Sequence, residues 1–445
     1  MNCQNLPENC NELVHEQECV LAKQPNQNLK NLSEIVSSFY KIITDFDVSN
    51  LIPIPKISSK ALQEMFDYRL ARLRQSMGEQ NVSLSILTNP VSLRYAIDFD
   101  EYQVFQSNTP TCYLFVPLEG PLVMHGATQK DFPNVSEYRR PNFISPFDGG
   151  VELVNKSMLF SKEVDSFMSQ HCYNKKIAVE RFSPLVVMSL KNLGCQISDA
   201  ECLLQKARMI KHQTEIECIK HSISVAEYGM KLMHENTISG ITERELWSIL
   251  HQVNISNNGS WMEGHMLSSG TRTNPWLQEA SERIIEKGDM VACDTDMIGP
   301  RGYMADISRS WICGGGRGNR EQRDAYQHAY DEVCFNIDAI KIGKSFSELS
   351  SEAFERNKIY KRNHYPCVYH GAGLTDEYPK IYYQEDWARD GYDGVIEQNM
   401  VLCVESYSGA EGGKVGVKLE EMVYITETGI ELLSYYPFED NLLVN

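Results

Sequence analysis

Five carboxylates in the C-terminal half stand within or beside short apolar runs, and this placement constrains the fold more than any other feature. They are Asp294, Asp296, Asp306, Glu405 and Glu420. Short apolar runs bounded by turn residues are typical of buried strands. Buried carboxylates cannot all stay ionised without compensating charge, and bound cations supply that charge. The pattern therefore predicts a metal centre carried by strands.

The first three acids lie close together in the sequence. Asp294 ends the run Gly-Asp-Met-Val-Ala-Cys-Asp, and Asp296 follows two positions later. Side chains of a strand alternate between its faces, so the two acids are predicted to share one face. Asp306 lies at the start of the next apolar run, in Ala-Asp-Ile-Ser-Arg. An antiparallel hairpin would bring it opposite the first pair.

The remaining candidate ligands come from later strands. Glu405 ends an apolar run, Glu420 follows Val-Lys-Leu, and His370 precedes Gly-Ala-Gly. Those glycines would let the backbone approach a site closely. An oxygen-rich set with one imidazole suits Mn, Fe, Co or Zn, often as two ions about 3.5–4 Å apart. Any one of these acids taken alone is more simply interpreted as a surface group. Five acids in this pattern are better interpreted as metal ligands.

Length and charge limit the architecture and the partners. A chain of 445 residues is too long for one typical core, so two domains are expected. The net charge of -18 argues against nucleic acid and anionic membranes. No signal peptide or apolar run long enough to span a bilayer is visible. The 13 cysteines, with no Cys-x-x-Cys pair, fit a reducing cytoplasm, and each is interpreted as a small buried hydrophobe.

Three regions are expected. Residues 1–60 are expected to form a polar extension or an arm around a partner subunit, with one helical pattern over 32–40. Residues 61–200 form an α/β domain, with a helix over 61–75 and strands over 83–87, 111–117, 121–125 and 176–180. Residues 201–445 form the second domain.

The second domain is expected to open with two capped helices. The first spans 214–236 behind a capping box of Thr214 and Glu217, and the second begins at the capping box of Thr242 and Glu245. One further helix is predicted over 320–340. Strands are predicted over 290–294, 304–311, 401–406, 415–419 and 422–426.

The order Asp, Asp, His, Glu, Glu on these strands resembles the creatinase, prolidase and methionine aminopeptidase family. The resemblance is clear over residues 205–430, and the α/β region before it looks like the creatinase N-terminal domain. It implies a mixed α+β protein: an α/β creatinase-like N-terminal domain followed by a catalytic domain of the "pita-bread" fold.

Three departures from the family pattern bear on function. Asp296 stands where the family usually has glycine, so a potential ligand is gained. Trp276 replaces a histidine that helps the family's peptidases bind substrate, and Glu377 replaces a second histidine, seven positions after His370. The metal ligands are thus kept and increased, while the peptide-handling histidines are missing.

This combination is similar to the branch of the family that cleaves dimethylsulfoniopropionate (DMSP). The resemblance implies a homodimer and two metal ions per subunit, with iron favoured. It also implies that Asp376 is the base of a β-elimination that yields dimethyl sulfide and acrylate. The implied metal ligands are Asp294, Asp296, Asp306, His370, Glu405 and Glu420. Metal coordination of the substrate carboxylate would acidify the neighbouring carbon.

Three aromatic residues are candidates for contact with the sulfonium group. Tyr365, Tyr369 and Trp276 flank the expected site, and aromatic faces attract cations. Tyr365 is also a candidate for assisting proton transfer. Ordinary packing is the alternative for each of them, and a turn residue is the alternative for Asp376.

The rival functions keep the same fold. One is an Xaa-Pro aminopeptidase or prolidase, against which the missing histidines count. Another is a creatinase-like C–N hydrolase, which need not use metal. A third is a binding module without activity, and the intact set of buried acids makes it the weakest alternative.

Overall fold

The computed structural model describes residues 52–127 and 130–443. These described residues belong to one compact unit. The predicted helical pattern over 32–40, and most of the predicted extension of residues 1–60, lie outside them. Within the described part of the chain, no helix combines the length and the apolar character needed to cross a membrane.

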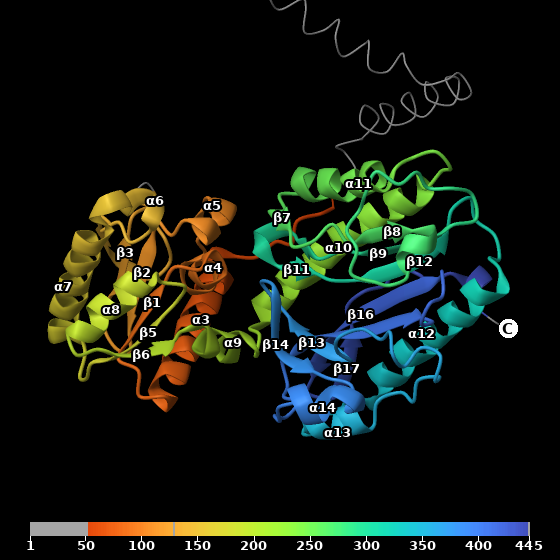
Figure 1. The fold of residues 1–445 in the computed structure, drawn as a ribbon. Helices are drawn as coiled ribbons and strands as arrows, with labels where there is room; N and C mark the ends of the chain where they lie inside the picture. The colour runs from red at the N-terminus through yellow and green to blue at the C-terminus, as the bar shows by residue number, and fades with distance from the viewer. Residues whose placement is uncertain (1–51, 128–129, 444–445) are drawn as a thin grey trace, which may run out of the picture. The chain divides into compact units, whose positions relative to one another are not determined.

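The N-terminal part is built on a six-stranded mixed sheet with strand order β4-β3-β2-β1-β5-β6 (Figure 1). Central strand β1 pairs antiparallel with β2 and parallel with β5. The strands are β1 (Leu84–Leu87), β2 (Tyr113–Pro117), β3 (Leu122–His125), β4 (Val135–Arg139), β5 (Lys176–Val179) and β6 (Gln196–Asp199).

Seven described helices accompany this sheet, and apolar side chains of α7 and α8 join its core. The predicted helix over 61–75 is confirmed as part of α3, and the four predicted strands correspond to β1, β2, β3 and β5. The helices are α3 (Ser59–Glu79), α4 (Pro90–Ile97), α5 (Gln103–Asn108), α6 (Pro146–Gly149), α7 (Leu153–His171), α8 (Pro184–Asn192) and α9 (Glu201–Arg208).

The C-terminal part contains an eight-stranded antiparallel sheet, of order β14-β13-β15-β16-β12-β9-β8, with β17 paired to β16. A small second sheet has the order β11-β10-β7. The strands are β7 (Trp261–Met262), β8 (Leu267–Ser269), β9 (Met290–Asp294), β10 (Met297–Ile298), β11 (Met304–Ala305), β12 (Ser308–Ile312), β13 (Tyr369–Ala372), β14 (Asp376–Ile381), β15 (Val401–Gly409), β16 (Gly416–Thr426) and β17 (Gly429–Leu432).

Two predictions about these strands need correction. The predicted strand over 304–311 is divided into β11 and β12, because Asp306 and Ile307 leave the ladder between them. The predicted strands over 415–419 and 422–426 are one continuous strand, β16, whose residues are buried from Gly416 to Ile425. Glu420 therefore lies in the middle of a strand, and not at an end.

Five helices complete this part: α10 (Gln213–Glu235), α11 (Glu243–Ser256), α12 (Arg320–Ala339), α13 (Phe346–Ser351) and α14 (Gln384–Asp390). Helix α12 packs against β15 and β16, and α10 packs against α11. The capping box of Thr242 and Glu245 is confirmed. The box predicted for α10 is wrong by two residues, since His212 caps the helix together with Glu215.

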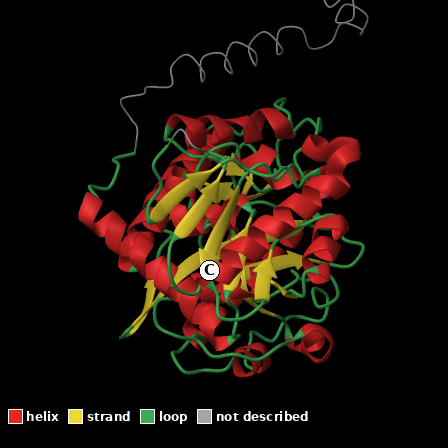
Figure 2. Cartoon of the chain, turned by 90° about the vertical axis from the view of Figure 1, so that its left-hand side faces the viewer, coloured by secondary structure: helices red, strands yellow, loops and turns green. Residues whose placement is uncertain are grey.

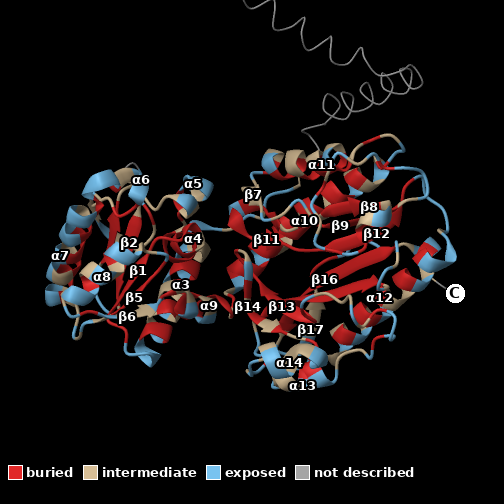
Figure 3. Cartoon of the chain, viewed as in Figure 1, coloured by how far each residue is buried: buried red, intermediate tan, exposed pale blue. Residues whose placement is uncertain are grey.

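Helices flank the strands in the view of Figure 2, and Figure 3 shows that the sheet strands are largely buried while the helices expose their outer faces. The sheet residues of the C-terminal part are therefore shielded from water, and charged side chains among them need partners.

Candidate metal centre and active site

The candidate ligands form a row across the C-terminal sheet. His370 on β13 pairs with Cys403 on β15, and Glu405 on β15 pairs with Glu420 on β16. Ser308 on β12 stands between Glu420 and Asp294 on β9. Because the register aligns these positions, strands far apart in the sequence deliver their side chains to one place.

The three aspartates join this row, although not for the predicted reason. Strand β9 ends at Asp294, and Asp296 has a left-handed φ of 39°, so strand alternation does not place it. Asp294, Asp296 and Asp306 nevertheless offer oxygens that all lie within 4.8 Å of one another. A turn, rather than an extended strand, brings Asp296 to the site.

A second group of possible ligand atoms shares Asp306 with the first. It comprises Asp306, His370, Cys403 and Glu420, again within 4.8 Å of one another. Glu405 lies beside this group, with its Oε1 3.1 Å from His370 Nε2. Two overlapping groups with a common carboxylate are the arrangement expected for a pair of ions.

The electrostatics of the cluster show a shortage of positive charge. Burial raises the pKa values of Asp296, Asp306 and Glu420 well above their usual range, and neighbouring carboxylates raise them further. Burial opposes a charged His370, but Asp376 and Glu405 raise its pKa to about 10. Without added cations the cluster therefore holds protons that divalent ions would replace.

Lys418 partly offsets the negative charge, and sequence reasoning missed it. Its fully buried Nζ lies 2.6 Å from Glu405, 3.0 Å from Asp294 and 3.1 Å from Glu420. Burial, the largest single effect, would raise the pKa of Asp294, but Lys418 together with hydrogen bonds to Ser308 and Asp306 outweighs it, so the pKa is lowered. One lysine cannot balance five carboxylates, so room for further positive charge remains.

Unpaired oxygens test whether the residues fit metal ions. Among the described residues, Asp294 Oδ1, Asp306 Oδ1 and Glu420 Oε1 are buried without a hydrogen-bond partner. Leaving a buried carboxylate oxygen unsatisfied is costly, and a cation would satisfy all three. The donor set of carboxylates and one imidazole therefore fits divalent ions.

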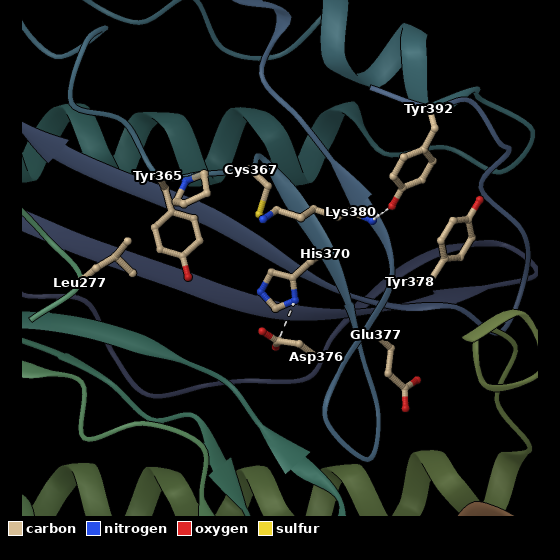
Figure 4. Close-up of a pocket in the computed structure, with 10 residues that line it drawn as sticks. Leu277, Tyr365, Cys367, His370, Asp376, Glu377, Tyr378, Lys380 and Tyr392 are labelled. Carbon is tan, nitrogen blue, oxygen red and sulfur yellow. Dashed lines mark hydrogen bonds and ion pairs between the residues drawn. The ribbon is translucent and has the colours of Figure 1, made fainter. Parts of the chain in front are cut away.

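A pocket of about 480 Å³ opens beside this cluster. Figure 4 shows His370 at its centre, with Asp376 beneath the imidazole. Asp376 Oδ1 lies 3.5 Å from His370 Nδ1, and its side chain is 59% exposed. Asp376 is thus an accessible carboxylate within reach of the buried cluster, as the sequence predicts.

The loop that carries Asp376 is fastened by the next residue, Glu377. This buried carboxylate contacts the ammonium of Lys211, and its Oε1 lies 3.4 Å from Arg208 Nε. It also accepts a hydrogen bond of 2.9 Å from the backbone N–H of Leu374. The residue in the position of the second peptidase histidine is therefore held in ion pairs at the pocket wall, with its carboxylate directed away from His370 (Figure 4).

The three predicted aromatic residues lie in different surroundings. Tyr365 lines the pocket with its hydroxyl directed inward (Figure 4), and burial raises its pKa well above the usual range, so the hydroxyl stays a proton donor. Tyr369 lies in the core, where its hydroxyl donates to the carbonyl of Asn336. Trp276 stacks on Tyr407 and is 7% exposed. The structure therefore brings only Tyr365 of the three to the pocket wall.

Other pocket residues were not foreseen. Leu277, Tyr378, Lys380 and Tyr392 line the wall around Asp376. Tyr378 and Tyr392 stack at 5.4 Å between ring centroids. They come from β14 and from the connection between α14 and β15, whose proximity no local sequence pattern indicates.

Comparison with known proteins identifies the family. The pattern of metallopeptidase family M24 matches residues 217–427, and that of the creatinase/prolidase N-terminal domain matches residues 69–210. Dimethylsulfoniopropionate lyase DddP of Roseovarius nubinhibens is 33% identical over 393 residues, which cover 86% of this chain and 88% of the relative. The DddP of Roseobacter denitrificans is 31% identical over the same shares.

A solved structure agrees on the fold. Xaa-Pro dipeptidase from Bacillus anthracis matches with a TM-score of 0.69 at 20% identity, covering 84% of this chain and 99% of its own. The expected fold class, a creatinase-like N-terminal domain followed by a pita-bread catalytic domain, is confirmed. The chain belongs to metallopeptidase family M24, within which it is similar to DddP over most of its length.

Proposed function

We propose that this protein is a metal-dependent lyase that cleaves DMSP to dimethyl sulfide and acrylate. The observation that carries the proposal is the position of Asp376, an exposed carboxylate 3.5 Å from a histidine of the buried cluster. Similarity to two DddP lyases over most of the chain supports the same substrate. A pocket of about 480 Å³ accommodates a molecule of this size.

The two ends of DMSP match two sides of the pocket. The carboxylate end would face His370 and the metal cluster, and the sulfonium end would face the rings of Tyr365, Tyr378 and Tyr392. Bound divalent ions would supply Lewis-acid polarisation of the substrate carboxylate. Tyr369 and Trp276 are not included, because neither lines the pocket.

Asp376 is the proposed base. It removes a proton from the carbon next to the substrate carboxylate. The electron pair of that C–H bond forms the new C=C bond, and the pair of the C–S bond leaves with sulfur as dimethyl sulfide. The Tyr365 hydroxyl, which stays protonated, would donate a hydrogen bond to the charge that develops on the substrate. Water then takes the proton from Asp376 and restores the base.

Incubation of the purified, metal-loaded protein with DMSP tests the proposal. Dimethyl sulfide measured by gas chromatography and acrylate measured by NMR should appear in equal amounts. Elemental analysis of the same sample reports the bound metal, for which iron is expected. A sample with its metal sites filled that forms neither product would refute the lyase.

The role of the base has its own test. Asp376→Asn should keep the metal content and lose turnover, because the amide cannot accept the substrate proton. Glu411→Gln is a matched control, since that carboxylate is 65% exposed on the connection between β15 and β16. Near-normal turnover of Asp376→Asn would place the base elsewhere.

Hydrolysis of Xaa-Pro dipeptides is the second candidate, and the fold shared with the Bacillus anthracis dipeptidase favours it. The ion pairs of Glu377 count against it. The resemblance to the family's peptidases implies a substrate-binding histidine at the position of Glu377. In this protein the Glu377 carboxylate is instead held by Lys211 and Arg208.

A further inference from the structure

Cys403 is a buried thiol on the ligand-bearing face of β15. It precedes Glu405 by two residues, so the two side chains share a face of the strand. It is also the cross-strand partner of His370. Its side chain is fully buried, and it forms no disulfide. The interpretation of every cysteine as a small buried hydrophobe overlooks this position.

The thiol completes a group of four possible ligand atoms. Cys403 Sγ lies 3.8 Å from Asp306 Oδ2. His370 Nε2 lies 3.6 Å from the same oxygen and 3.8 Å from Glu420 Oε1. All four atoms lie within 4.8 Å of one another.

These separations are close to those of ligands around one ion. Metal bonds of about 2.0–2.3 Å to oxygen, nitrogen and sulfur put neighbouring ligand atoms of a tetrahedron roughly 3.3–3.5 Å apart. The three separations given above exceed this by a few tenths of an ångström, which small side-chain adjustments would remove, and the remaining pairs lie within 4.8 Å. Sulfur therefore stands at one corner of a nearly formed coordination site.

A second observation points to a cation at this place. Glu420 Oε1 and Asp306 Oδ1 are buried and have no hydrogen-bond partner among the described residues. The sulfur does not satisfy them, because a thiol is a weak donor and its contact with Asp306 is long. If Cys403 served only to fill space in the core, both carboxylate oxygens would remain unpaired.

We propose that Cys403 is a metal ligand, so that one of the two ion positions is a mixed site of Asp306, His370, Cys403 and Glu420. On binding, the S–H bond breaks, its proton leaves to solvent, and a sulfur electron pair forms the metal–sulfur bond. A thiolate favours softer ions, so this position should prefer zinc, cobalt or iron over manganese and magnesium. The proposal concerns the metal centre alone and does not depend on which substrate the enzyme cleaves.

Cobalt substitution tests the ligand directly. The chelator-treated protein is loaded anaerobically with Co(II) to two ions per chain, and its absorption spectrum is recorded. Wild type should show a thiolate-to-cobalt charge-transfer band in the near ultraviolet. Cys403→Ser should lose this band and keep the visible cobalt bands.

Cys293→Ser is the matched control. Cys293 is also fully buried, and it lies on another ligand-bearing strand, β9, but it is not in the four-atom group. It should retain the band. Absence of the band from cobalt-loaded wild type, or its persistence in Cys403→Ser, would overturn the proposal.

X-ray absorption of the wild-type protein loaded with zinc gives a test that needs no variant. It should show a sulfur neighbour at about 2.3 Å. A shell made only of oxygen and nitrogen at full occupancy would contradict the assignment. Sulfur ligation in a protein without lyase activity would uphold the ligand and refute only the proposed reaction.

Discussion

Lys418→Met perturbs the charge balance of the metal centre more directly than any ligand substitution. The lysine ammonium is fully buried among the carboxylates of Asp294, Glu405 and Glu420, at 2.6–3.1 Å. Methionine has a similar length, so the substitution removes the charge with little change in volume. Three buried carboxylates then lose their shared cation.

The expected loss of folding stability in Lys418→Met is large only when metal is absent. Removing one partner of a buried ion pair costs about 3–5 kcal/mol. For a chain of this length, that loss lowers the melting temperature by about 3–5 °C. Divalent ions would supply the missing positive charge, so the metal-loaded variant should recover part of the loss. Recovery of about 2 kcal/mol corresponds to roughly 30-fold tighter metal binding.

Thermal unfolding in chelator and in saturating Mn(II), at one ionic strength, measures both effects. The rise in melting temperature on adding metal should be larger in Lys418→Met than in wild type. Lys414→Met is the control, because this lysine is exposed on the connection leading into β16. Equal metal-induced shifts in variant and wild type would refute the charge argument.

Three further predictions concern the loop, the pocket and the N-terminal part. Lys211→Met should lower kcat for DMSP at least tenfold at unchanged metal content, because Glu377 loses a partner and no longer fixes the position of Asp376. Lys211→Arg should restore part of the rate. A change in KM alone would contradict this role. Tyr365→Phe should lower kcat by about 10²-fold, the loss typical of one donor to developing charge, and a normal rate would remove the tyrosine from the mechanism. Burial raises the pKa of Glu180 to about 7. Between the usual pKa of a glutamate and pH 7, the folded protein therefore holds more protons than the unfolded chain. The free energy of unfolding consequently falls as pH rises through this window. The free energy of unfolding in urea should therefore differ less between pH 5 and pH 8 in Glu180→Gln than in wild type, by about 2.5 kcal/mol. An unchanged difference would contradict the buried acid.

The sequence predicts the candidate metal centre because the acids lie in strongly apolar strands. Asp294, Asp306, Glu405, Glu420 and His370 come from four strands and the approach to a fifth, and the sheet register brings them together. The same alternation of side chains could have identified two missed residues. Lys418 shares a strand face with Glu420, and Cys403 shares one with Glu405.

Alternation also explains an aromatic residue that was misplaced. Tyr369 is adjacent to His370 on β13, so its side chain must point to the opposite face, where it packs in the core. Asp296 was placed correctly for the wrong reason, since a turn and not a strand carries it.

Contacts between distant segments were beyond local patterns. The ion pairs of Glu377 with Arg208 and Lys211 join residues more than 160 positions apart. The pocket wall depends on the stacking of Tyr392, which follows α14, on Tyr378 of β14. The predicted start of α10 was two residues late. The imidazole of His212 caps the helix in place of the predicted Thr214, although threonine is the more usual capping residue.

A side-by-side assay tests the central claim, that this metal centre serves elimination and not peptide hydrolysis. One metal-loaded preparation is offered DMSP and an Xaa-Pro dipeptide in separate reactions, and dimethyl sulfide, acrylate and free proline are measured. The account predicts dimethyl sulfide and acrylate from DMSP, with proline release no faster than in a blank. Release of proline without formation of dimethyl sulfide would contradict it.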